Sequence, residues 1–313
     1  GKVRSVRAEL VLSFYHSLIV FRITFMIDLH LHTTASDGVL SPSALVERAF
    51  DVGIRILSVT DHDTMAGIDE ASDAALARGM KFLPGVEITA VDNRKDIHML
   101  AYFLENEEER LAPFLARQRS DRVRRAREMS KKLSEAGLSI NIDEKILRCE
   151  STGGAVGRPD VANALLAAGH VASVQEAFDR FLGDGCPAYV PRKGMSPVQV
   201  VRVVTQVGGV TALAHPGLLK KDSLIPNLAR KGLDAIEVYH SDHASSDEAR
   251  YLRLSEEHGL AVSGGSDFHG AHHRRAKCFG KIGLPRQRFL VLIDRLKQAH
   301  KKVHGVVPLG FGL

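Results

Sequence analysis

Two histidines, His30 and His32, stand two residues apart at the end of a short apolar segment. In an extended strand, residues two apart lie on the same face, so both imidazoles would point to one side. Neutral imidazole is the commonest metal ligand among side chains. The pair therefore predicts a metal site, although two unrelated surface histidines would look the same in isolation.

Further residues of ligand type recur along the chain, most of them at or just after the end of an apolar segment. In sequence order they are Asp37, His62, Glu87, His98, His215, Asp267 and His269. A donor set of nitrogen and oxygen without cysteine suits Mn²⁺, which we expect first, or Fe²⁺ or Zn²⁺. Because these residues with the first pair exceed the needs of one ion, we expect two or three divalent ions, with Glu87 as a bridge.

The segments that would carry these residues alternate with helical patterns. The expected strands are 27–32, 55–60, 82–89, 97–103, 209–214, 233–239 and 261–267. Ser41-Pro42 and Ser196-Pro197 have the form of helix starts, with a capping serine before a proline in the first turn. Strands that alternate with helices favour a mostly parallel α/β barrel. In such a barrel the strand ends converge on one rim, where barrel enzymes place their sites.

This alternation stops in the middle of the chain, where the pattern is mostly helical. We expect an extension outside the fold at 1–25, a first barrel part at 26–104, a helical insertion or cap at 105–193 and a second barrel part at 194–313. The extension is basic and poor in acids, so a targeting peptide is the alternative interpretation. Its apolar stretch is too short and too interrupted to cross a bilayer.

Composition excludes several classes of protein. The chain has 313 residues, of which 44% are hydrophobic and 25% charged, which argues against a disordered, fibrous or disulfide-rich protein. A net charge of +5 is too small to indicate nucleic-acid binding by itself. The three cysteines have no C-x-x-C spacing, which favours a reducing, cytoplasmic location. Nothing in the sequence indicates a membrane or an obligatory protein partner.

The segments DLHLHTTASDG, SVTDHDT, LPGVEIT, IHML, LAHPG and GSDFH together resemble the polymerase-and-histidinol-phosphatase (PHP) family of metal-dependent phosphoesterases. The resemblance covers roughly residues 27–285 and implies a distorted (β/α)7 barrel. By motif, a first ion would take His30, His32, Glu87 and Asp267, a second Asp37, His62 and His269, and a third Glu87, His98 and His215. Asp28, Asp61, Asp63 and Glu237 would orient imidazoles from outside the ligand shell.

Within the family, the sequence is most similar to bacterial enzymes with a helical insertion. These hydrolyse 3′,5′-nucleoside bisphosphates such as pAp, and some trim RNA from its 5′ end. The resemblance implies that Arg122 and Arg125, on a helix expected at 106–136, hold the second phosphate of the substrate. It also implies that Arg158 and the backbone N–H of Gly157, in a glycine-rich loop, contact phosphate.

Other charged residues near these arginines are assigned differently. Arg119 shares the helical face of Arg122 and Arg125, whereas Arg124 and Arg127 point more nearly elsewhere. Arg192 and Lys193 fit an exposed hinge better than a phosphate site. Asp160 stands where related enzymes carry histidine, which affects the expected substrate preference.

The predicted function is metal-dependent hydrolysis of a phosphate monoester. The substrate would be a 3′,5′-nucleoside bisphosphate, or a short 5′-phosphorylated oligonucleotide. The nucleophile would be a hydroxide that bridges the metals, because no serine, threonine or cysteine has a visible base partner. The alternatives are a histidinol-phosphate phosphatase and a non-catalytic, metal-stabilised RNA-binding module.

Overall fold

The computed structural model describes residues 25–308 of the chain. The expected extension at 1–25 thus lies outside the described residues, except for Phe25, which packs against the main core. The strands are β1 (Met26–Asp28), β2 (Ile54–Leu57), β3 (Lys81–Phe82), β4 (Gly85–Asp92), β5 (Lys95–Tyr102), β6 (Val210–Leu213), β7 (Ala235–His240) and β8 (Ala261–Gly265). They form two sheets, in the orders β1-β2-β3 and β4-β5-β6-β7-β8.

The two sheets close into one distorted barrel along two seams. At one seam Leu31 pairs in parallel with Phe268, and at the other His62 pairs with Glu87. Backbone hydrogen bonds follow both seams, such as the 2.9 Å bond from the Asp63 N–H to the Glu87 carbonyl. The α/β barrel expected from the alternating pattern is confirmed, and both seams run beside predicted ligands.

The expected strand 82–89 is divided, and its partner runs the other way. Pro84 interrupts the segment, so that β3 pairs with β2 while β4 pairs with β5. Asn93 and Arg94 have φ of 50° and 67°, the left-handed pair that a tight hairpin turn requires. β4 and β5 are therefore antiparallel, because a two-residue turn leaves no length for the crossover that parallel strands need.

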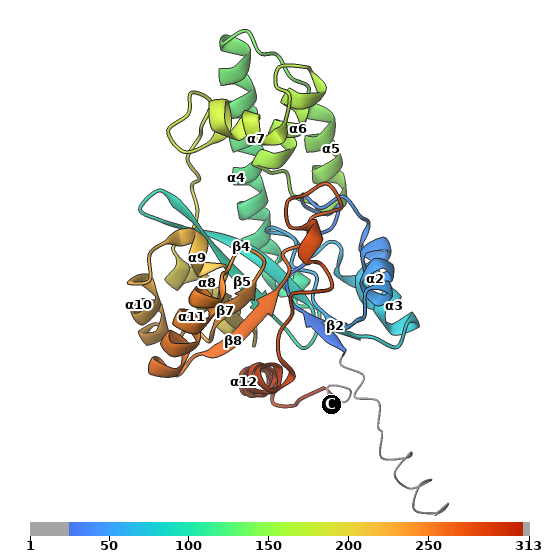
Figure 1. Cartoon of the computed structure of the whole chain (residues 1–313), viewed down its shortest axis with the longest axis vertical. Coiled ribbons are helices and arrows are strands. Elements are labelled where there is room, and N and C mark those ends of the chain that lie inside the picture. The colour runs from blue at the N-terminus through green and yellow to red at the C-terminus, as the bar shows by residue number, and fades with distance from the viewer. Residues whose placement is uncertain (1–24, 309–313) are drawn as a thin grey trace, which may run out of the picture.

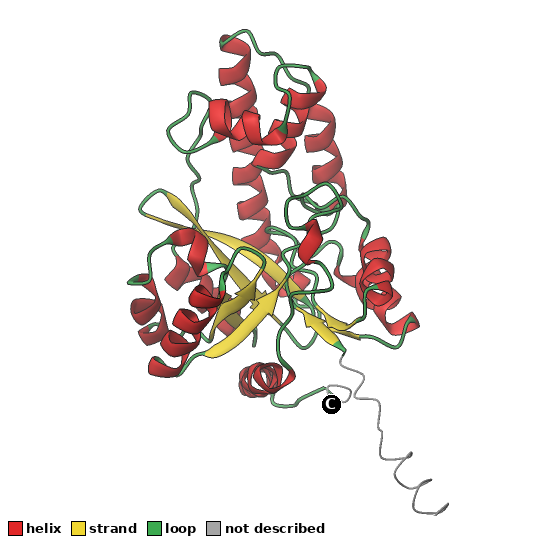
Figure 2. Cartoon of the chain, viewed as in Figure 1, coloured by secondary structure: helices red, strands yellow, loops and turns green. Residues whose placement is uncertain are grey.

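Helices cover the outside of the barrel (Figures 1 and 2). They are α2 (Pro42–Asp51), α3 (Ile68–Ala77), α8 (Pro197–Gln206), α9 (Pro216–Leu219), α10 (Leu224–Arg230), α11 (Ser245–Glu257) and α12 (Arg286–His304). The short helix η2 (Ala276–Cys278) lies in the connection between β8 and α12. The predicted start of α2 is confirmed, since the Ser41 hydroxyl accepts a 3.2 Å hydrogen bond from the Ala44 N–H. None of the described helices has both the length and the apolar composition needed to cross a bilayer.

A separate group of helices stands above one end of the barrel (Figure 1). It consists of α4 (Glu108–Glu135), α5 (Asp143–Thr152), α6 (Arg158–Ala167), α7 (Val174–Ala177) and η1 (Phe178–Leu182). These helices, which we call the cap, have an apolar core of their own, made of buried residues between 126 and 190. The long helix α4 joins both cores: Leu111 and Leu115 pack in the barrel core, and Met129 and Leu133 in the cap core.

Candidate metal centre

Nine side chains of ligand type meet at the cap-facing end of the barrel. His30 and His32 follow β1, and His62 follows β2. Glu87 lies in β4 and His98 in β5. His215 follows β6, and Asp267 and His269 follow β8. Asp37 lies in the turn after β1. The sequence-predicted ligands are therefore brought together, as expected of strand ends that share one rim.

Glu87 is the centre of this group. Its Oε2 lies 3.2 Å from His30 Nε2, 3.2 Å from His32 Nε2 and 3.1 Å from His62 Nδ1. Its Oε1 lies 2.7 Å from His98 Nδ1 and 3.1 Å from His215 Nε2. One carboxylate thus faces five imidazoles, which is the arrangement that a ligand shared between ions requires.

The other two acids each face histidines at similar distances. Asp267 Oδ1 lies 3.1 Å from His32 Nε2 and 3.4 Å from His269 Nδ1. Asp37 lies 3.4 Å from His269 Nε2 and 3.7 Å from His62 Nε2. These contacts define two four-residue groups whose donor atoms lie within 4.8 Å of one another, His30-His32-Glu87-Asp267 and His32-Asp37-His62-His269.

Several of these atoms are buried without a hydrogen bond. They include His30 Nε2, both ring nitrogens of His32, His62 Nδ1 and Asp267 Oδ1. Buried polar atoms are costly unless they are paired. Divalent ions among them would satisfy all of these donors, and mixed imidazole and carboxylate ligands suit Zn²⁺, Mn²⁺ or Fe²⁺. The residues present therefore fit a cluster of metal ions.

Two of the pKa values favour metal binding, whereas neighbouring acids raise the pKa of His30 and, to about 10, that of His32 against the effect of burial. Burial alone would raise the pKa of Glu87, but the imidazoles of His62, His98 and His30 hold the pKa of that carboxyl well below its usual value. Burial lowers the pKa of His215 to about 4, so this imidazole is neutral and free to act as a ligand at pH 7. An ionised acid beside a neutral imidazole is the state in which both bind a cation.

The backbone is strained at three positions around the centre. Asp63, His215 and Asp267 have φ of 54°, 28° and 52°, a left-handed conformation that non-glycine residues seldom adopt. Each is held by a hydrogen bond from its backbone N–H: that of Asp63 donates to the Glu87 carbonyl at 2.9 Å, that of His215 to Glu237 Oε2 at 2.8 Å, and that of Asp267 to the His30 carbonyl at 2.8 Å. Such strain persists where the surroundings enforce it, commonly at functional sites.

The four acids expected to orient imidazoles have different roles, and only Glu237 contacts a ligand ring. Its Oε1 accepts a 2.8 Å hydrogen bond from His30 Nδ1. Asp28 accepts from the backbone N–H groups of His30 and Ser266, which joins β1 to β8. Asp61 accepts from Thr33 and Ser36 in the turn that carries Asp37. Asp63 pairs with Arg122. Sequence position alone could not separate these roles.

Glu237→Gln is expected to weaken metal binding about tenfold, because one carboxylate orients the His30 ring and fixes the His215 backbone. Titration of the metal-free protein with Mn²⁺ measures the affinity. An affinity equal to that of the wild type would show that Glu237 does not orient these ligands. Glu248→Gln, on α11, is the matched control.

Two residues for which the sequence indicated no role hold Oδ2 of Asp267, the oxygen that does not face the ligand histidines. His240 Nε2 lies 3.2 Å from Asp267 Oδ2, and the Arg275 guanidinium pairs with the same oxygen. Arg275 also donates from Nε to Asp242 Oδ2 at 2.8 Å. These contacts leave Asp267 Oδ1 facing the histidines. His240 could have been found from its place at the end of an expected strand, whereas nothing in the pattern indicated Arg275.

Arg275→Met is expected to lower metal affinity and hydrolysis about tenfold, because Asp267 would lose the charge that fixes its orientation. Metal titration and a phosphatase assay on the same preparation measure both effects. Arg274→Met is the control, since Arg274 pairs with Asp242 and not with Asp267. Equal losses in the two variants would mean that the contact with Asp267 is unimportant.

Four arginines gather at the base of the cap around two acids. Arg122 Nε donates to Asp63 Oδ2 at 2.6 Å, and Arg192 Nη1 to the same oxygen at 3.2 Å. Asp96 Oδ2 lies 3.5 Å from Arg125 Nη1 and 3.6 Å from Arg158 Nη2. We call Arg122, Arg125, Arg158 and Arg192 the arginine cluster. Asp63 follows the ligand His62 and Asp96 is two residues before the ligand His98, so the cluster adjoins the metal centre.

The arginine cluster differs from the sequence expectation in two ways. Arg192, interpreted as part of an exposed hinge, is only 6% exposed and belongs to the cluster. The N–H of Gly157, expected to face phosphate, already donates to Asp160 Oδ2 at 2.7 Å. Asp160 thus closes the first turn of α6, and Gly157 offers no free N–H to a ligand. Neither outcome could be read from residue spacing.

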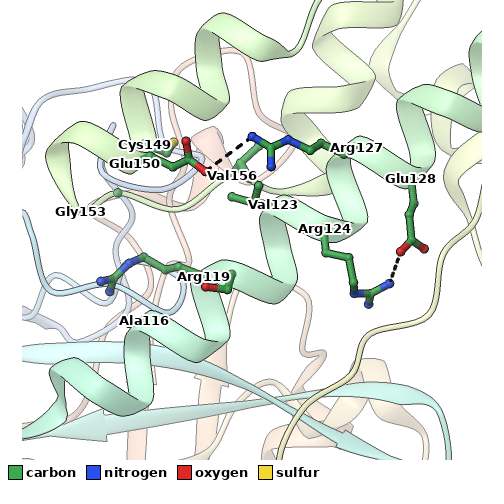
Figure 3. Close-up of a pocket in the computed structure, with 12 residues that line it drawn as sticks. Ala116, Arg119, Val123, Arg124, Arg127, Glu128, Cys149, Glu150, Gly153 and Val156 are labelled. Atoms are coloured by element: carbon green, nitrogen blue, oxygen red, sulfur yellow. Dashed lines mark hydrogen bonds and ion pairs between the residues drawn. The ribbon is translucent and has the colours of Figure 1, made fainter.

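Three further arginines of α4 lie beside a cavity outside the arginine cluster (Figure 3). Arg119, Arg124 and Arg127 border a cavity of about 600 Å³ between α4, α5 and the loop after α5. Arg127 pairs with Glu150 at 3.7 Å and Arg124 with Glu128 at 3.0 Å. Arg124 and Arg127 pair with these glutamates and not with Asp63 or Asp96, in agreement with their predicted place off the face of Arg122 and Arg125. Arg119 borders this outer cavity as well, but it also donates to the Asp63 carbonyl at 3.5 Å, beside Arg122, as its spacing predicts.

Comparisons with known proteins agree with this site. The PHP domain model matches residues 28–181. The 3′,5′-nucleoside bisphosphate phosphatase of Chromobacterium violaceum is 33% identical over 248 residues, which are 78% of this chain and 87% of that protein. The chain belongs to the PHP family. As a member it is a metal-dependent phosphoesterase. His215, Asp267 and His269 lie outside residues 28–181, which the domain model matches, and the fold brings them to the same centre.

Two further relatives support the assignment. The 5′-3′ exoribonuclease Rnm of Escherichia coli is 33% identical over 249 residues, 77% of this chain and 84% of that protein. The solved structure of a predicted metal-dependent phosphoesterase from Bifidobacterium adolescentis is 32% identical with a TM-score of 0.79 and covers 87% of this chain and 96% of that one. The PHP fold inferred from the sequence motifs is therefore confirmed.

Proposed function

We propose that this PHP phosphoesterase hydrolyses the phosphate monoester of a 3′,5′-nucleoside bisphosphate and also acts on short 5′-phosphorylated oligonucleotides. The observation that carries the proposal is the charge of the arginine cluster. Four guanidinium groups face only two carboxylates, Asp63 and Asp96. Two positive charges are thus left over beside the metal centre, which matches a second phosphate group on the substrate.

The arginine cluster also has unused hydrogen-bonding capacity. Arg125 Nη2 and Arg192 Nε are buried without a hydrogen bond. Arg158 is the most accessible of the four, with 28% of its side chain exposed, and its ion pair with Asp96 is long at 3.6 Å. Guanidinium groups bind phosphate through charge-assisted, often bidentate hydrogen bonds. A phosphate bound at the arginine cluster would therefore be held mainly by the exposed Arg158, with further hydrogen bonds from the more deeply buried Arg125 and Arg192.

The remaining roles follow from the geometry of the metal centre. Divalent ions in such a centre polarise the phosphoryl oxygens and lower the pKa of water. One ion would be held by His30, His32, Glu87 and Asp267, and a second by Asp37, His62 and His269. A third would be held by Glu87 with His98 and His215, both of which face its Oε1. Glu237, His240 and Arg275 orient these ligands. The arginine cluster would select a substrate whose second phosphate reaches it.

An assay with pAp tests the proposal directly. We expect the protein loaded with Mn²⁺ to release phosphate from pAp with a higher kcat/KM than from p-nitrophenyl phosphate or histidinol phosphate. Histidinol phosphate represents the alternative function, which needs only one phosphate and leaves the surplus charge of the arginine cluster unexplained. If Mn²⁺ is bound and histidinol phosphate is the better substrate, the proposal is wrong. RNA binding without release of product from any substrate would instead favour the non-catalytic alternative.

A further inference from the structure

A second group of metal-ligand side chains lies at the C-terminal end of α12, separate from the metal centre. His300 and His304 are one helical turn apart, and their rings stack with centroids 4.1 Å apart at an angle of 13°. Glu107, at the start of α4, places its Oε1 3.2 Å from His304 Nε2. Donor atoms of these three residues all lie within 4.8 Å of one another. We call them the α12 triad.

His300 is the unusual member of the α12 triad. Only 2% of the residue is exposed, and its ring makes no side-chain hydrogen bond with the described residues. Its nearest acid is Glu105, whose Oε2 lies 3.8 Å from His300 Nε2. The ring nitrogens of His300 are thus unengaged within reach of two acids and a second imidazole.

The three contacts of His304 Nε2 cannot all be hydrogen bonds at the same time. Its Nε2 lies 3.1 Å from the Val207 carbonyl, 3.2 Å from Glu107 Oε1 and 3.1 Å from Arg110 Nη1. One ring nitrogen carries either a proton or a lone pair. It cannot donate to the two oxygens and accept from Arg110 at the same time. No single tautomer satisfies all three contacts, so the geometry leaves His304 available to another partner.

We propose that His300, His304 and Glu107 form a structural site for one divalent transition-metal ion, with Zn²⁺ as the best match. Two histidines four residues apart present their nitrogens on one face of a helix, and a carboxylate completes three of the four ligands of a tetrahedral ion. Glu105, which is 58% exposed, or a water molecule supplies the fourth. The ion would replace the contacts of His304 with the Val207 carbonyl and with Arg110.

Among the described residues, Arg110 is the cation that contacts the α12 triad, and it does not block the site. Its side chain is 46% exposed, and its pairing with Glu107 Oε2 is long at 3.5 Å. It can therefore turn into solvent when an ion binds. The ion would connect the last turn of α12 to the first residues of α4, and so would stabilise the junction between the barrel and the cap.

The test counts metal ions on the full-length protein. Wild type, His304→Ala and Glu107→Gln are dialysed to equilibrium against the same Zn²⁺ solution, and the zinc per chain is measured by mass spectrometry. We expect both variants to bind one zinc ion fewer than the wild type. His258→Ala, at the end of α11, is the matched control and is expected to keep the wild-type count. Equal counts in wild type and both variants would overturn the proposal.

Two further measurements separate the site from the metal centre and from misfolding. The Mn²⁺-dependent phosphatase activity of His304→Ala is expected to equal that of the wild type, because the α12 triad shares no residue with the metal centre. Added Zn²⁺ is expected to raise the Tm of the wild type more than that of Glu107→Gln, since an ion that binds only the folded state stabilises it. An equal rise in Tm for both proteins would contradict a structural ion here.

Discussion

Glu87→Gln is expected to reduce phosphate ester hydrolysis on the order of a thousandfold. Both oxygens of Glu87 face the imidazoles of the centre, so this one carboxylate contributes to two of the three proposed ion sites. The amide keeps the shape but loses the negative charge that balances the ions. Metal ions contribute several kcal/mol to transition-state stabilisation, and about 4 kcal/mol corresponds to a factor on the order of 10³ in rate.

The measurement is kcat/KM for pAp together with the number of Mn²⁺ ions bound per chain. We expect both to fall in Glu87→Gln. Glu257→Gln is the control, because the Glu257 side chain is 52% exposed on α11 and, among the described residues, forms an ion pair with Arg253 alone. A variant that kept the wild-type rate and metal count would contradict the role of Glu87 as a shared ligand.

Arg158→Met is expected to lower kcat/KM for pAp about a hundredfold and to leave that for p-nitrophenyl phosphate nearly unchanged. Hydrogen bonds to charged groups contribute about 1.5–3 kcal/mol, and the upper end corresponds to a factor on the order of 100. Only a substrate with a second phosphate would lose this contact. Methionine retains much of the apolar stem but removes the guanidinium group, which lies 5.9 Å from the centroids of the Phe178 and Tyr189 rings.

The choice of Arg158 over Arg122 rests on the structure. Arg122 is buried and pairs with Asp63, whose carboxyl pKa is held at about 2 by Arg122 and Arg192 against the effect of burial. Removing Arg122 would leave a buried, unpaired carboxylate and cost about 3–5 kcal/mol of stability, which would obscure a change in selectivity. Arg127→Met, on the outer face of α4, is the control. Equal losses on both substrates in Arg158→Met would show that Arg158 does not select bisphosphates.

The expectations that came true rested on local patterns. His30 and His32 share a face because strands have a period of two, and Ser41-Pro42 begins a helix because the serine caps it. The expectations that failed concern the direction in which a strand runs, because the local pattern of residues does not determine it. The segments around Glu87 and His98 both looked like strands, but only the turn at Asn93-Arg94 determines that they run antiparallel.

The arginines show the same limit. Helical spacing places Arg119, Arg122 and Arg125 on one face, and Arg119 does reach the Asp63 carbonyl beside Arg122. The packing of the cap alone decides that Arg122 and Arg125 are buried while Arg119 also borders the outer cavity. Arg192 lies 70 residues beyond Arg122 in the chain and meets it only because both pair with Asp63. Periodicity describes one helix, whereas burial depends on which neighbour covers it.

The amino-acid sequence was enough to show which donor side chains this protein offers to a metal, and thereby its family. Residue type decides which side chains can bind a metal, and their position at strand ends indicates that they lie on one rim of the barrel. Only the tertiary structure decided how the donors are grouped. Glu87 and His62 meet across one seam of the barrel, and Asp267 reaches His32 beside the other. Contacts between residues so distant in the chain depend on how the sheets close, which no local pattern of residues encodes.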